Sequence, residues 1–86
     1  MVIETKDLWQ GAYLLTEGGW LEGVKVNRHP DGKKEFLFRL TGERVETEAR
    51  RFIEGDATCN LRIFRRHVNH LKDVVFGGRR EERAGL

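Results

Sequence analysis

The residues with the most chemical potential lie between positions 65 and 72, in the segment RRHVNHLK. His67 and His70 are three residues apart, so two imidazoles on one helix could reach the same zinc ion. A closed zinc site needs a third and a fourth ligand, and the chain offers only Cys59 and His29. Neither C-x-x-C nor H-E-x-x-H occurs in the sequence. We therefore expect no metal site and no cofactor.

Nucleophilic catalysis is the second chemistry to consider, because Cys59 precedes two histidines. A cysteine and a base also need an orienting group, an oxyanion hole and a pocket, and the sequence carries a signature for none of these. The glycines form neither G-x-G-x-x-G nor a phosphate-binding loop. We expect Cys59 to be a small buried hydrophobic residue. The chain is expected to be no enzyme and to have no small-molecule substrate.

Cations near the C-terminus offer a third chemistry, the binding of nucleic acid. Residues 1–56 carry nine Lys/Arg and eleven Asp/Glu, whereas residues 57–86 carry seven and three, although the whole chain has a net charge of only +2. A basic helix face, the segment that follows it and a basic hairpin tip would form a groove if they lie on the same side. The candidate nucleic-acid-binding residues are Arg62, Arg65, Arg66, Asn69, Lys72, Arg79, Arg80, Arg28, Lys33 and Lys34.

Two alternatives to nucleic-acid binding remain open. In the first, Arg62, Arg65 and Arg66 pair with acidic residues of the preceding helix and form an ordinary solvated surface. In the second, one helix and a two-stranded sheet do not bury all of Trp9, Tyr13 and Trp20, and the rings left exposed form a protein-interaction surface. That surface would bind a partner or a second copy, for which the two open edges of the hairpin provide another route. The open alternative to that surface is that Trp20 caps the small core beside Trp9.

The elements that position these residues can be predicted from patterns. Thr5 is a suitable N-cap for a helix over residues 6–17, which Gly18-Gly19 would end. Two strands follow, WLEGVKVN (20–27) and KEFLFRL (34–40), joined by RHPDGK, whose Pro-Asp-Gly is a turn signal. In the second strand Phe36, Phe38 and Leu40 point toward one face, which we expect to lie on the core. The residues between them point toward the other face.

Two further helices are expected after the hairpin. One spans residues 43–54 and ends at Gly55; the other has Asn60 as its N-cap and ends at Gly77-Gly78. In the last helix an apolar stripe with a 3-4-3-4 spacing should face the core and leave the arginines outside. The stripe consists of Leu61, Phe64, Val68, Leu71 and Val75.

These elements define an α+β fold in which a two-stranded antiparallel hairpin is covered on one face by three helices, in the order α-β-β-α-α. Residues 1–78 would form a single compact domain, and residues 79–86 a flexible basic tail. The chain has no apolar run long enough to span a membrane and no export signal at its N-terminus, so a cytoplasmic location is expected.

The succession AYLLTEGGWLEGVKVNRHPDGKKEFLFRLTG, followed by a helix and FIEGDATCNLRIFRRHVNHLKDVVFGG, resembles a family of short bacterial and phage proteins that share a domain of unknown function. The similar features are a helix that ends in A-x-L-L, a glycine turn, L-x-G-V entering the hairpin, an aromatic second strand and a late Leu-Lys pair. Asn60-Leu61 stands where such sequences often have Asp-Pro. The resemblance implies a single α-β-β-α-α domain, and it implies no activity or ligand.

Overall fold

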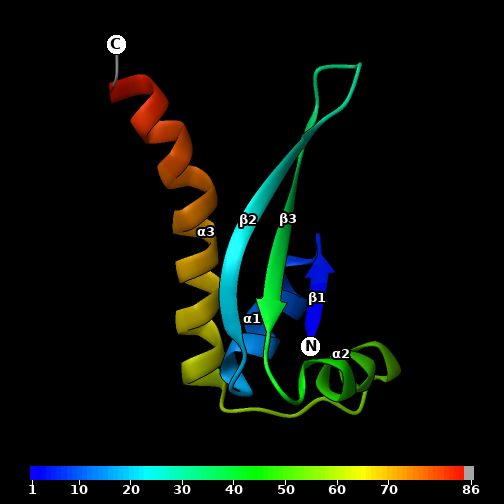
Figure 1. Cartoon of the computed structure of the whole chain (residues 1–86). Coiled ribbons are helices and arrows are strands. Elements are labelled where there is room, and N and C mark those ends of the chain that lie inside the picture. The colour runs from blue at the N-terminus through cyan, green and yellow to red at the C-terminus, as the bar shows by residue number, and fades with distance from the viewer. Residues whose placement is uncertain (85–86) are drawn as a thin grey trace.

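The computed structural model describes residues 1–84, and it describes the side chains of residues 1–76. The chain forms an α+β fold with three helices and a three-stranded antiparallel sheet of order β1-β3-β2 (Figure 1). Along the chain the elements are β1 (Val2–Thr5), α1 (Leu8–Thr16), β2 (Trp20–Arg28), β3 (Lys34–Thr41), α2 (Val45–Glu54) and α3 (Leu61–Ala84). α1 contacts every other element, and α3 packs mainly against α1. The three helices therefore do not lie side by side on the sheet.

The sheet has three strands, so the prediction of a two-stranded hairpin is wrong in this respect. β1 pairs antiparallel with β3, from Val2 opposite Thr41 to Thr5 opposite Phe38. Its sequence, Val-Ile-Glu-Thr, is rich in the β-branched residues that favour strands. The pairing places β3 in the centre of the sheet and supplies the third strand that an isolated hairpin needs for stability.

The first helix begins after Asp7, not after Thr5. The Asp7 carboxylate accepts hydrogen bonds from the backbone N–H groups of Trp9, at 2.9 Å, and Gln10, at 3.3 Å, as an N-cap does. Thr5 belongs to β1, and its buried hydroxyl donates to Oε1 of Gln10 at 2.6 Å. The two residues thus join the end of the strand to the start of the helix. The predicted end is confirmed, because Gly18 follows the helix with φ of +94°.

The predicted hairpin is confirmed, with Lys34 opposite Arg28 and Phe38 opposite Val24. Gly32 has φ of +86° and donates to the carbonyl of His29 at 3.0 Å, which closes the Pro-Asp-Gly turn. A register shift between Leu21 and Gly23 forms a bulge in β2. Such a bulge bends an edge strand and disrupts its ladder.

The core lies where α1 meets β3 and α3. Phe38 and Leu40 of β3 are fully buried, as the alternation in this strand predicted, and Leu71 of α3 is fully buried as well. Gly11 stands between them: a Cβ atom at this position would lie 3.2 Å from Leu71 Cδ1 and 3.8 Å from Leu40 Cδ1. The missing side chain of Gly11 therefore makes room for the side chain of Leu71.

α2 begins at Val45, two residues later than predicted, whereas α3 begins as predicted after Asn60 but ends later. Gly55 ends α2 with φ of +84°, and Asn60 caps α3 by accepting from the N–H of Ile63 at 3.1 Å. The prediction that Gly77-Gly78 ends the last helix is wrong, because α3 continues to Ala84. Glycine lowers helix stability without forbidding a helix, and the Arg and Glu residues that follow are good helix formers. Residues 79–86, expected to form a tail, thus begin inside α3, while residues 85–86 and the side chains from position 77 onward lie outside the described part.

One position of the predicted apolar stripe of α3 is not buried. Val68 and Leu71 are buried and Phe64 and Val75 are partly buried, whereas Leu61 is 78% exposed. Leu61 occupies the first turn of the helix. The periodicity therefore predicts the buried face of α3 correctly but extends this face one turn too far toward the N-terminus of the helix.

Candidate functional site

The outward side of α3 carries a row of polar residues that we call the outer ridge. At about 100° per residue, the ridge lies roughly 160° away from the centre of the buried stripe. Its spacing of 4, 3 and 4 residues keeps it straight along the helix, and all its members are exposed. The outer ridge consists of Arg62, Arg66, Asn69 and Asp73. It presents three side chains that donate hydrogen bonds and, at one end, a carboxylate.

Two more cations of α3, Arg65 and Lys72, lie beside the outer ridge, and we call them the flank. They are seven residues apart, hence on the same side of the helix, and both are exposed. Among the described residues, the four cations of the ridge and the flank form no ion pair. The expected pairing with the acidic residues of α2 does not occur there. These cations are therefore available to an anionic partner.

Glu48, in the first turn of α2, has partners on α1, at the N-cap of α2 and within α2 itself. Glu48 has a side chain that is only 5% exposed, and it accepts hydrogen bonds from the Tyr13 hydroxyl at 2.6 Å and from Nη2 of Arg44 at 3.1 Å. Nη1 of Arg51 lies 3.8 Å from the same carboxylate. Because these groups satisfy Glu48, it does not neutralise the arginines of α3.

The hairpin tip, which we define as residues 28–34, forms a second basic surface. Arg28 and Lys34 are directly opposite each other in the β2–β3 register, and both are exposed. Like charges at opposed positions of a sheet repel, so this pair favours a bound anion. Lys33 adds a third exposed cation, whereas His29 lies 3.6 Å from the Glu35 carboxylate.

The hairpin tip and the basic residues of α3 can be placed relative to the long axis of the molecule. The hairpin extends past α1 and α2, and its tip lies at the same end of the molecule as the C-terminal half of α3 (Figure 1). The first turns of α3 lie at the opposite end. Lys72 is thus closer along the helix to the end that carries the tip than Arg62 is. The candidate residues do not gather in one groove: they follow one helix and one projecting hairpin.

Two of the candidate residues cannot be placed in this way. Arg79 and Arg80 lie in the part of α3 whose side chains are outside the described residues. Their backbone is helical, so the two arginines extend the helix that carries the outer ridge.

The histidines of α3 and Cys59 lie in environments that shift the pKa values of His67 and Cys59. The pKa of His67 is lowered, first because partial burial disfavours the charged imidazolium and then because His70 and Arg66 are close. Burial raises the pKa of the Cys59 thiol, and the Glu17 carboxylate raises it further. Cys59 thus has little tendency to form a reactive thiolate. Within residues 1–76, no group of three or more His, Cys, Asp or Glu residues could hold a metal ion.

The three aromatic residues predicted to be exposed differ from one another. Tyr13 is buried, with 2% of its surface exposed, so the prediction of an exposed Tyr13 is wrong. Its ring packs at a centroid distance of 5.8 Å from Phe52, and its hydroxyl bonds to Glu48. Trp9 is 54% exposed and stacks on Phe64 at 5.9 Å, while Trp20 is 73% exposed. Trp9 and Trp20 therefore remain as candidate contact residues.

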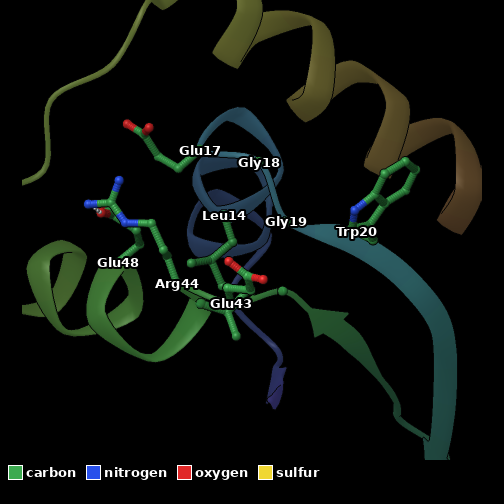
Figure 2. A pocket seen from close by; sticks show the side chains of 10 residues that line it. Leu14, Glu17, Gly18, Gly19, Trp20, Glu43, Arg44 and Glu48 are labelled. Carbon is green, nitrogen blue, oxygen red and sulfur yellow. Dashed lines mark hydrogen bonds and ion pairs between the residues drawn. The ribbon is translucent and has the colours of Figure 1, made fainter.

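A surface hollow of about 370 Å³ lies where the turn after α1 meets the turn before α2. Figure 2 shows Glu17, Arg44 and Glu48 together at the left of the hollow and Trp20 apart from them at the right. Glycines make the hollow possible, because a Cβ atom at Gly19 would lie 2.8 Å from the carbonyl oxygen of Leu14. Sequence patterns do not indicate this hollow, since its residues come from segments that are distant along the chain.

Among the described residues, no helix is long and apolar enough to cross a membrane. Comparisons with known proteins give no match: no protein-family model, no curated protein and no solved structure is similar to this chain. The site must therefore be interpreted from its own geometry.

Proposed function

We propose that this protein is a non-enzymatic binding module that contacts nucleic acid through α3 and the hairpin tip. The observation that carries the proposal is the state of the cations on α3, which are exposed and have no ion pair among the described residues. The alternative of a salt-bridged surface requires pairs with the acidic residues of α2, and the described residues form no such pair with α3. Phosphates are the anions most often bound by such rows of Arg and Lys.

The charge of the hairpin tip supports the same function. Keeping Arg28 opposite Lys34 costs free energy in the absence of an anion, and a phosphate between them removes this repulsion. The tip lies at the same end of the molecule as the C-terminal half of α3 (Figure 1). Two separated basic surfaces suit an extended polyanion better than they suit a small anion.

Removing the flank tests this function. The variant Arg65→Ala plus Lys72→Ala should bind labelled nucleic acid more weakly, with a loss of about tenfold at low salt. Each lost phosphate contact should lower the slope of log K against log salt by about 0.7 to 0.9, which gives a change of about 1.4 to 1.8 for the pair. Fluorescence anisotropy over a salt series measures both quantities.

The matched control is Lys6→Ala plus Arg50→Ala, which removes two exposed cations outside the two surfaces. This control should retain the affinity and the salt slope of the wild type. If neither DNA nor RNA is bound by the wild type at low salt, nucleic-acid binding is excluded as the function.

Exposed tryptophans favour a second candidate function, the binding of a protein partner or a second copy. Trp20 is 73% exposed at the start of the edge strand β2 and beside the hollow. A dimer that joins two sheets edge to edge is disfavoured, because the edge strand β1 is only four residues long and the edge strand β2 carries a bulge. A dimer would therefore have to use the indole itself.

Sedimentation equilibrium distinguishes this second candidate. If Trp20 anchors a dimer, the wild type should have the mass of two chains and Trp20→Ala the mass of one. The variant Ile53→Ala, which removes a side chain that is 77% exposed on α2, is the control. A mass of one chain at every concentration would rule out self-association through Trp20.

A further inference from the structure

We infer that the nucleic acid bound by α3 is duplex DNA of the B form, with the outer ridge in the major groove. This inference rests on the proposed function and specifies its ligand. α3 has 24 residues and is therefore about 36 Å long, and its outward side carries exposed residues over all the turns whose side chains are described. A helix with side chains is roughly 10–12 Å across, which fits a major groove about 12 Å wide.

The side chains of the outer ridge suit base edges. Arginine forms paired hydrogen bonds with guanine, and asparagine forms them with adenine. Arg62 and Asn69 are seven residues apart, or about 10 Å along the helix, which corresponds to about three base-pair steps. Arg66 lies between them on the same row. The ridge thus presents three potential base contacts spread over about four base pairs, while Arg65 and Lys72 lie to one side, where a phosphate backbone would run.

The other kinds of nucleic acid fit less well. The major groove of duplex RNA is deep and narrow and does not admit a helix. Single strands are bound by successive aromatic rings that alternate with cations, and neither the outer ridge nor the flank contains an aromatic residue. Trp9 stacks on Phe64, a residue of the buried stripe, and Trp20 lies on β2. Phe76 follows Lys72 by one turn, and a single ring gives no series of stacking platforms.

Asp73 marks the end of the contact. Its carboxylate is exposed on the outer ridge and has no ion pair among the described residues. A carboxylate in the groove is repelled by the phosphates on both sides. The Asp73→Asn variant should therefore bind duplex DNA about threefold more tightly, or better, whereas a residue of the solvated surface alone would leave binding unchanged.

The experiment compares three labelled ligands of the same mixed sequence, each about 20 nucleotides long: duplex DNA, duplex RNA and single-stranded DNA. Anisotropy titrations between about 50 and 200 mM NaCl should give the highest affinity for duplex DNA, by about tenfold or more. Arg62→Ala plus Arg66→Ala should reduce duplex binding by at least about tenfold, and Lys6→Ala plus Arg50→Ala should not. Because all these side chains are exposed, circular dichroism should confirm that each variant is folded.

The outcomes separate this inference from the proposed function. Equal or tighter binding of single-stranded DNA or duplex RNA would overturn the inference and leave the proposed function standing. Duplex DNA binding that is unaffected by both the ridge variant and Asp73→Asn would place the contact elsewhere and would also overturn it. Failure to bind any of the three ligands would overturn the proposed function itself.

Discussion

Leu71→Ala should destabilise the folded protein by about 2 to 5 kcal/mol, because it leaves a cavity where α1, α3 and β3 meet. Leu71 has no exposed surface, and its Cδ1 atom lies against the backbone of Gly11. Small domains have a free energy of unfolding of roughly 5 to 15 kcal/mol, so this single change removes a large share of it. Urea denaturation followed by tryptophan fluorescence measures the loss.

Leu61→Ala is the matched control for this prediction, since it makes the same substitution in the same helix at a position that is 78% exposed. It should change the free energy of unfolding by less than about 0.5 kcal/mol. Equal losses in the two variants would contradict the packing described for α3.

Gly11 provides a second check on the same contact. Gly11→Ala should improve helix propensity by about 1 kcal/mol, but in the wild type the new methyl group meets Leu71 at 3.2 Å. In the Leu71→Ala background that obstacle is absent. The double variant should therefore be more stable than Leu71→Ala alone, and the two changes should not be additive.

Tyr13→Phe should destabilise the protein by about 1 to 3 kcal/mol, because it leaves the buried Glu48 carboxylate without its 2.6 Å hydrogen bond. Arg44→Ala removes another partner of the same carboxylate, but the Arg44 side chain is 69% exposed. Its loss should cost less than about 1 kcal/mol. A larger loss for Arg44→Ala than for Tyr13→Phe would contradict the assigned roles.

The same tyrosine predicts a pH dependence. Burial raises the pKa of Tyr13, and the hydrogen bond to Glu48 and the negative charge of that carboxylate raise it further. Above about pH 10 the phenol ionises in the unfolded chain while the folded protein keeps its proton, so the folded state loses stability as the pH rises. Tyr13→Phe has no phenol to ionise and lacks this loss. Above pH 10 the stability of the wild type should therefore fall toward that of Tyr13→Phe. Denaturant titrations at several alkaline pH values test the convergence.

Phenolate absorbance reports this ionisation directly, because Tyr13 is the only tyrosine of the chain. Its midpoint in the native protein should lie well above that of the urea-denatured chain. Coincident midpoints would show that the buried hydrogen bond does not form.

Much of the fold follows from local patterns. Pro30-Asp31-Gly32 and the alternating Phe36, Phe38 and Leu40 are strong signals, because turn chemistry and side-chain period are properties of adjacent residues. β1 was missed because four residues give too short a period, and because its stability comes from pairing with a strand more than thirty residues away. A long-range pairing of this kind leaves no local signature.

The candidate site could be predicted only in part. Helical spacing correctly separates the exposed Arg62 and Arg66 from the buried Val68, because the exposed face and the buried face of α3 both follow from the helix period. Helical spacing does not reveal the hydrogen bond from Tyr13 to Glu48, because this contact joins two helices through the core. The 78% exposure of Leu61 likewise does not follow from the periodic pattern within α3.

The pairing of Val2 with Thr41 has a consequence for the order in which the protein can fold during synthesis. A chain is synthesised from its N-terminus, so β1 is made before β3 and has no partner until β3 has left the ribosome. Leu71 emerges later still, and without it the space beside Gly11 is open. Contacts between distant parts of a chain slow its folding. β1 therefore has to wait for β3, and the domain should become stable only after the segment that contains Leu71 has been made.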